Sequence, residues 1–486
     1  MDEQNRNLIL ATALSFLVIL VWTVFFTPEQ VPPTLEAVPE GGVSAPSGDG
    51  IAAAPPAEGA TAIGTETLGE TGASNRADAL AATRRVEIST PRVIGSLSLT
   101  GGRIDDLSFV DYRETVDPTS PAVVLLSPFG APDAYYAIYG WAPAGGYDGA
   151  LPNAKTEWSV ESGTVLTPQT PITLVWDNGA GLIFRRAVSI DANYMFSVEQ
   201  SVENTTAAPV RLAPYGIVAR HGEPDTIGFY ILHEGIVQAS DGEIAETDYD
   251  DMPDFTVDPV ERAAVQKTDV AENGWIGFTD KYWMTTLIPQ PGQPFTAVAK
   301  YTAGAEVYQT DMRLPVQDVA PGTTVGITSM LFAGAKEWEP IRDYQDDDGI
   351  VQFVDSIDWG WFFFLTKPMF QLLHFLNQLI GNMGWAIIGL TFVVKLVLFP
   401  LAYKSYSSMA KMKMLQPEME KLKERAGDDR QALQKEMMAL YKKEKVNPAA
   451  GCLPILLQIP IFFSLYKVIF VTLELRHAPF IGWIKD

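Results

Sequence analysis

The chain has 486 residues and a formal net charge of −24, a balance that argues against nucleic acid as a partner. Its single cysteine, Cys452, excludes an intramolecular disulfide, and its four histidines show no spacing typical of metal ligands. We therefore expect no metal site and no cofactor.

The N-terminus contains an apolar run of nineteen residues, Leu8 to Phe26, which is long enough to span a membrane. A cleaved signal peptide would have a shorter apolar core and a basic start, so a membrane anchor over residues 1–26 is favoured over that alternative. Residues 27–85 are rich in Pro, Gly and Ala and contain no aromatic residue. Such a composition buries little apolar surface, so we expect a flexible tether.

Residues 86–345 contain short strand-like runs separated by turn signals such as Gly101-Gly102 and Pro321-Gly322. Between Phe196 and Val202 apolar and polar residues mostly alternate, as in a half-buried strand. This pattern predicts one large antiparallel β-sandwich.

The same domain has carboxylates and histidines that could in principle form acid/base pairs, namely Glu203, His221, Glu223, Asp225 and His233. Their spacing is not diagnostic, and scattered surface carboxylates are an ordinary finding, so we do not expect catalysis here. Trp275, Tyr282 and Trp283 are interpreted as core or sheet-surface aromatics.

Residues 358–381 are expected to form an amphipathic helix. Its polar side chains fall at helical spacing on one face: Lys367, Gln371, His374 and Gln378. A polar stripe on a helix rich in Trp and Phe predicts a helix lying in the membrane interface, and a membrane span is the alternative. Gly381 and Gly384 are expected to interrupt the helical pattern.

The next segment, Met383 to Ala402, has twenty residues and is almost entirely apolar except for Lys395. At about 1.5 Å per residue it matches a hydrocarbon core of about 30 Å, so we predict a transmembrane helix over residues 383–403. A lysine at this depth normally faces protein or water rather than lipid.

Residues 404–447 are polar and basic. Between Tyr403 and Lys445 the sequence has eleven Lys and Arg residues and seven Asp and Glu residues. Such an excess of positive charge is typical of a cytoplasmic loop. Amphipathic spacing on both sides of Gly427 predicts an antiparallel helical hairpin. Its methionines suit contacts with varied apolar partners, or they hold the two helices together. The candidate contact residues are Met412, Met414, Leu415, Met419, Met437 and Met438.

A further transmembrane helix is predicted over residues 451–473, with Gln458, Pro454 and Pro460 inside it. Polar groups at such a depth are usually satisfied by neighbouring helices or water. Residues 474–486 would begin a periplasmic segment.

Several stretches together resemble the YidC/Oxa/Alb family of membrane protein insertases. They are TFVVKLVLFPL (391–401), SSMAKMKMLQPEMEKLKER (407–425), the run 427–466 and ELRHAPFIGWIKD (474–486), and the resemblance also covers NRNLIL in the anchor and WIGFTDKYW. Only the tether lies outside the resemblance. The resemblance implies a multi-domain membrane protein with a large periplasmic antiparallel β-supersandwich and part of an α-helical transmembrane insertase core.

The family further implies a multi-pass protein of the Gram-negative inner membrane, with a cytoplasmic N-terminus and residues 27–382 in the periplasm. Its core has five helices around a hydrophilic groove that contains a basic residue, arginine in many members. Lys395 matches that position, and we assign Thr391, Cys452 and Gln458 to the same groove. Because only two core helices are present before Asp486, we expect the sequence to be truncated.

The resulting prediction is an insertase that hydrolyses nothing and helps nascent membrane proteins to insert and fold. The family implies the Sec translocon with its accessory subunits, the ribosome and the phospholipid bilayer as partners. A membrane-anchored sugar-binding or sugar-modifying protein and a solute transporter remain alternatives.

Overall fold

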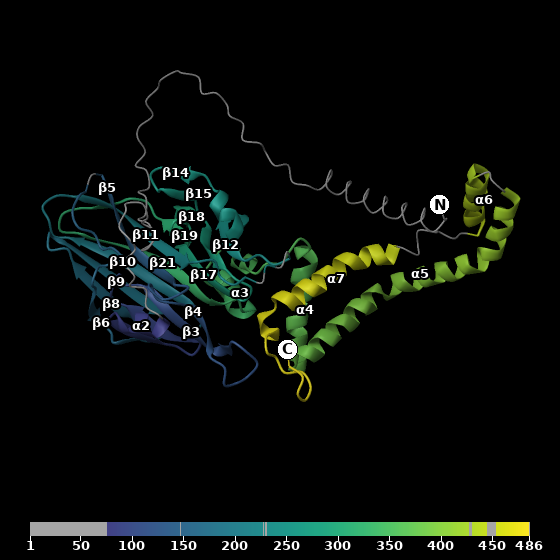
Figure 1. Cartoon of the computed structure of the whole chain (residues 1–486), viewed down its shortest axis with the longest axis horizontal. Coiled ribbons are helices and arrows are strands. Elements are labelled where there is room, and N and C mark those ends of the chain that lie inside the picture. Colours follow the sequence, from purple (N-terminus) through teal and green to yellow (C-terminus); the bar gives the residue numbers. More distant parts are fainter. Residues whose placement is uncertain are drawn as a thin grey trace, which may run out of the picture. The chain divides into compact units, whose positions relative to one another are not determined.

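The structure is a computed structural model that describes residues 75–145, 147–226, 228, 231–426, 430–444 and 453–485. The predicted N-terminal anchor and most of the predicted tether lie outside the described residues. A large β-domain is followed by a helical part at the C-terminal side of the chain (Figure 1).

The β-domain consists of two sheets. The larger has twelve strands among the described residues, and its main path runs in the order β14 (Val257–Asp258), β15 (Ala263–Val270), β18 (Phe295–Thr302), β19 (Val307–Arg313), β11 (Val210–His221), β5 (Tyr135–Ala144), β3 (Ile104–Arg113), β2 (Val93–Ser98), β1 (Arg85–Ser89) and β7 (Val165–Leu166). Strand β20 (Gln317–Val319) pairs with β11, and β4 (Ala122–Leu126) pairs with β3.

The smaller sheet has nine described strands, in the order β13 (Glu243–Asp248), β12 (Gly235–Ser240), β16 (Gly274–Thr279), β17 (Trp283–Pro289), β21 (Thr324–Ala335), β10 (Met195–Asn204), β9 (Leu182–Ile190), β8 (Ile172–Asp177) and β6 (Ser159–Ser162). Strand pairing is antiparallel except between β1 and β7, which run parallel. The predicted antiparallel sandwich is therefore confirmed.

Apolar and polar residues alternate along the strands, so each sheet has one apolar face, and these two faces pack against each other. In β10 the side chains of Phe196, Val198 and Val202 are buried, whereas Glu199 points to solvent, as the sequence predicts. The predicted turn at Gly101-Gly102 is also confirmed, because both glycines adopt positive φ between β2 and β3.

A buried ion cluster crosses the outer strands of the larger sheet. Glu261 accepts from Arg313 Nη1 at 2.6 Å and from Lys300 Nζ at 3.0 Å, and Arg313 also pairs with Asp311. Burial alone would raise the pKa of Glu261, but the hydrogen bonds and charges of Arg313 and Lys300 lower this pKa to about 2.

Replacing Glu261 with glutamine is therefore expected to lower the free energy of unfolding at pH 7 by about 3 kcal/mol or more, since the buried Lys300 loses its carboxylate partner and the buried Arg313 keeps only Asp311. The folded-state pKa lies below the ordinary value of 4.5, so the stabilisation is complete above pH 4.5 and is lost as the pH falls towards 2. Urea unfolding of both proteins at pH 7 and pH 3 measures this loss. Glu243→Gln, at an exposed position on β13, is the control, and an equal deficit of the E261Q variant at both pH values would contradict the prediction.

The helices are α2 (Arg76–Ala81), α3 (Trp338–Asp346), α4 (Phe363–Ile380), α5 (Met383–Ala426), α6 (Arg430–Lys443) and α7 (Leu453–Val471), with short 3-10 turns at Tyr249–Asp254, Phe353–Ser356 and Leu473–Leu475. Helix α2 and the first residue of β1 fall in the range predicted as tether. They fold because Ala79 is buried and Arg76 pairs with Asp106 of β3. The folded domain thus begins earlier than the composition indicated.

The junction between α4 and α5 also differs from the sequence interpretation. Gly381 ends α4 in the left-handed conformation, as expected of a glycine after a helix. Gly384, however, lies inside α5, where a β-carbon would meet the Phe480 ring at 2.2 Å. This glycine therefore allows close packing rather than breaking the helix.

The hydrophobic core of the β-domain continues into the helical part. Trp338 of α3, Trp359 of the loop before α4 and Phe370 of α4 pack with ring centroids 5.1 to 5.9 Å apart, and all three side chains are buried. Val468 of α7 and Leu390 of α5 belong to the same core cluster. The β-domain and the ends of three helices consequently share one core.

Candidate substrate path along α5 and α7

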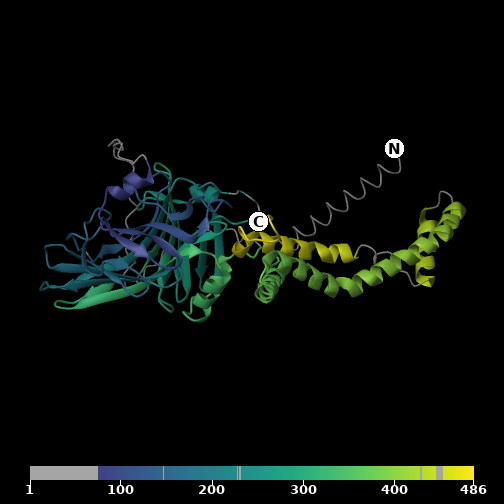
Figure 2. The same cartoon turned by 90° about the horizontal axis from the view of Figure 1, so that it is seen from below.

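Helix α5 is a single continuous helix (Figure 2). Its first turns are packed, with Met383, Ala386 and Leu390 buried, but beyond Leu390 apolar side chains such as Phe392 and Val397 are exposed. Among the described residues, α5 is the one helix long and apolar enough to cross a membrane. Helix α7 contains a shorter apolar stretch, Leu456–Val471.

Lys395 lies in this exposed apolar stretch of α5. Its side chain is exposed, and it forms no ion pair or hydrogen bond with any described residue. Thr391, one turn earlier on the same face, is half-buried, and its Oγ1 donates to the carbonyl oxygen of Ile387 at 2.9 Å. The structure thus presents a cation and a hydroxyl on one side of an otherwise apolar helix.

The other two residues assigned to the groove are less well placed. Gln458 lies on α7 and is half-buried, without a hydrogen bond to Lys395 in the described part of the chain. Cys452 lies outside the described residues. That these four residues share one groove therefore stays a prediction.

Helix α6 lies beside the end of α5, where Tyr441 of α6 donates to the sulfur of Met419 at 3.5 Å (Figures 1 and 2). The candidate contact residues divide into two groups by exposure. The first group is half-buried and consists of Met412, Leu415, Met419 and Met437. The second group is exposed and consists of Met414 and Met438, which can contact a partner without rearrangement of the two helices.

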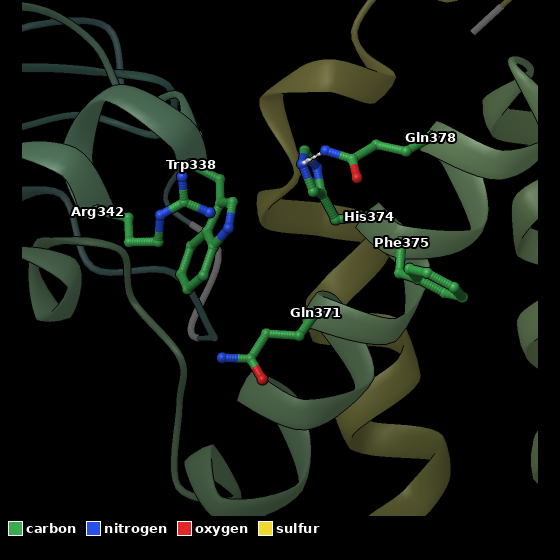
Figure 3. Close-up of a pocket in the computed structure, with 6 residues that line it drawn as sticks. All are labelled: Trp338, Arg342, Gln371, His374, Phe375 and Gln378. Atoms are coloured by element: carbon green, nitrogen blue, oxygen red, sulfur yellow. Dashed lines mark hydrogen bonds between the residues drawn. The ribbon is translucent and has the colours of Figure 1, made fainter.

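The polar stripe on α4 contacts α3 but stays open to solvent, because Gln371 and Gln378 are exposed and His374 is half-buried. His374 and Gln378 both contact Glu339 Oε1 of α3, at 3.1 and 3.0 Å, and Lys367 pairs with Asp355. Figure 3 shows Gln371, His374 and Gln378 on the side of α4 towards Trp338 and Arg342 of α3, whereas Phe375 points away from them. The shallow cleft between them has a volume of about 240 Å³ and is lined by Trp338, Arg342, Gln371, His374, Phe375 and Gln378.

The acid/base candidates of the β-domain do not converge on one site. Glu203 pairs with Arg185, whereas His233 is buried with its ring nitrogens 2.7 Å from Asp248 Oδ1 and 2.8 Å from the carbonyl oxygen of Ile236. His221 lies 3.4 Å from the Tyr136 hydroxyl, where burial and the charge of Arg103 lower its pKa. Glu223 and Asp225 are exposed.

The sequence interpretation missed Lys467, near the C-terminal end of α7. This lysine is buried and pairs with Asp358, in the loop between the β-domain and α4. A lysine near the end of an apolar segment ordinarily extends to the membrane surface, so its sequence position carried no signal of a buried ion pair.

Comparisons with known proteins agree with this division of the chain. The family model described as the YidC periplasmic domain matches residues 85–372, and the one described as 60Kd inner membrane protein matches residues 375–486. The chain is 61% identical over 488 residues to the membrane protein insertase YidC of Dinoroseobacter shibae, a match that covers 100% of this chain and 79% of the relative.

Two solved structures are more distant. A crystal structure of an active YidC insertase is 18% identical with a TM-score of 0.26 and covers 81% of this chain and 72% of its own. A putative aldose 1-epimerase from Escherichia coli K12 is 13% identical with a TM-score of 0.34 and covers 52% of this chain and 99% of its own.

These matches decide between the alternatives left open by the sequence. The relatives that are 56 to 61% identical over the whole chain are named as membrane protein insertases, and the two family models together cover the β-domain and the helical part. The chain therefore belongs to the YidC family of membrane protein insertases, inner membrane proteins that carry a periplasmic domain and are not enzymes.

Proposed function

We propose that this insertase guides the polar flank of a nascent membrane protein along the face of α5 that carries Lys395 and Thr391, while the apolar segment of the client moves into lipid. Gln458 of α7 and Cys452, which precedes α7 in the sequence, would line the same path. An exposed lysine, without a counter-ion among the described residues, lies within the apolar first half of α5 and supports this proposal. Such a cation attracts acidic and polar groups strongly in a low-dielectric site.

The length of α5 supports a topology. Its 44 residues extend over about 66 Å, roughly twice the hydrocarbon thickness of about 30 Å, so that its second half projects beyond the bilayer. The basic residues of 404–447 favour the cytoplasm for that half, which leaves residues 27–382 in the periplasm and the N-terminus in the cytoplasm.

In this arrangement the two helices α5 and α6 would meet clients first. Exposed Met414 and Met438 supply apolar contacts, and the surrounding lysines suit a ribosome or the anionic surface of the bilayer. The Sec translocon and its accessory subunits would hand over clients from the side. Helix α4 would lie in the periplasmic interface, with its exposed Phe363, Phe364 and Leu379 towards lipid.

The test is reconstitution of the chain in liposomes together with translation of a single-span client. We expect the client to become protease-protected across the bilayer in proteoliposomes and not in empty liposomes. A solute transporter, in contrast, would release an entrapped dye or ion without a nascent chain, and flux without insertion would overturn the proposal.

A further inference from the structure

We infer that Lys467 and Asp358 form a charged joint that fixes the periplasmic end of α7 to the β-domain, which makes Lys467 a positioning residue for the path along α5 and α7. The inference rests on the proposed function, because it concerns the placement of the helix that carries Gln458.

The geometry of Lys467 differs from that of a lysine at a membrane surface. Its side chain is only 7% exposed, and its ammonium donates to the Asp358 carboxylate and to the carbonyl oxygen of Ile231. The stem passes Gly360 so closely that a β-carbon there would lie 3.5 Å from Lys467 Cε. The lysine therefore points into the β-domain rather than towards lipid headgroups.

The β-domain and the loop that follows it hold Asp358 in place. One carboxylate oxygen accepts from the backbone N–H of His233 at 3.0 Å, and the other accepts from the backbone N–H of Gly360 at 3.0 Å. His233 is itself fixed by Asp248 and by the carbonyl oxygen of Ile236. The Asp358 carboxylate is thus held in position by these hydrogen bonds, and Lys467 of α7 supplies the cation that pairs with it.

Further contacts continue the joint beyond Lys467. Lys281 Nζ lies 3.8 Å from the centroid of the Phe470 ring, and the Arg476 guanidinium lies 5.7 Å from the centroid of the Trp283 ring. Glu474 accepts from the backbone N–H of Trp338 at 3.2 Å. An ion pair, two cation–π contacts and a hydrogen bond thus follow one another between Lys467 and Arg476, and together they favour one seating of α7 on the β-domain.

The joint affects the path because α7 connects Lys467 rigidly to Gln458. Gln458 lies nine residues before Lys467, about 13 Å along the helix axis. A change in the seating of Lys467 therefore shifts Gln458 relative to Lys395 without any change in the residues of the path itself.

The test compares four variants in the full chain: Lys467→Met, Asp358→Asn, the two combined, and Lys467→Arg. We expect K467M to lower client insertion in proteoliposomes about fivefold or more, a modest coupling between distant sites. The combined variant should be no worse than K467M, because the two residues act through one contact. K467R keeps the cation and its donors and should retain insertion. Lys485→Met, at an exposed lysine in the same C-terminal segment, is the matched control.

Hydrogen exchange of the same variants separates seating from general unfolding. K467M should speed exchange in residues 466–475 and leave β9 and β10 unchanged. The inference is overturned if K467M inserts like the unaltered chain, if K485M loses as much, or if exchange rises throughout the β-domain. If the unaltered chain inserts nothing, the proposed function fails and the positioning role with it, although the local difference in exchange would remain.

Discussion

Replacing Lys395 with glutamate is expected to reduce insertion of clients with acidic exported segments by more than about tenfold. Two unit charges about 4 Å apart interact by about 4 kcal/mol at an effective dielectric constant of 20, and the substitution turns that attraction into repulsion. A loss of only 1.4 kcal/mol would already account for a factor of ten. Insertion is measured as the protease-protected fraction of client at fixed times.

Two controls make this result specific for charge at that position. Lys395→Arg keeps the cation and should retain insertion, although arginine is planar and lysine is not. Lys485→Glu makes the same charge reversal on an exposed lysine outside α5, α6 and α7. Unimpaired insertion by K395E, or an equal loss in K485E, would exclude a role for Lys395 in attracting acidic segments.

Replacing Phe370 with alanine should lower the free energy of unfolding by about 3–5 kcal/mol, because the cavity would open between Trp338 and Trp359. Phe370 is 3% exposed and lies 5.1 and 5.2 Å from those two ring centroids. The loss should appear first as faster hydrogen exchange in α4, since this ring holds α4 to the β-domain.

Phe375, on the same helix, provides a matched control because its side chain is 59% exposed. Phe375→Ala removes the same atoms from an open surface and should change the free energy of unfolding in detergent by less than about 0.5 kcal/mol. If both variants lose the same stability, the buried aromatic cluster does not join α4 to the β-domain.

Much of this architecture follows from local sequence patterns. Alternation in β10 and the glycine turn after β2 predicted the sandwich because both depend on neighbouring residues. The long apolar run around Lys395 predicted a spanning helix for the same reason. Gln371, His374 and Gln378 do lie on one helix face, but the sequence did not indicate that His374 and Gln378 would contact Glu339 of α3.

Contacts between distant segments could not be predicted in this way. Lys467 and Asp358 are 109 residues apart, and Glu261 and Arg313 are 52 apart, so no local periodicity connects either pair. The local sequence around a charged residue also looks the same whether its side chain is exposed to solvent or buried in an ion pair. Only the fold distinguishes these two states.

Site-specific photocrosslinking can detect directly whether a nascent chain passes along the face of α5 that carries Lys395. A photoreactive amino acid is placed at Lys395, or at Val397, which is exposed on the opposite side of the helix. We expect an arrested nascent membrane protein to crosslink from position 395, and position 397 to react mainly with lipid. Equal crosslinking from both positions, or crosslinking from 397 alone, would contradict this expectation.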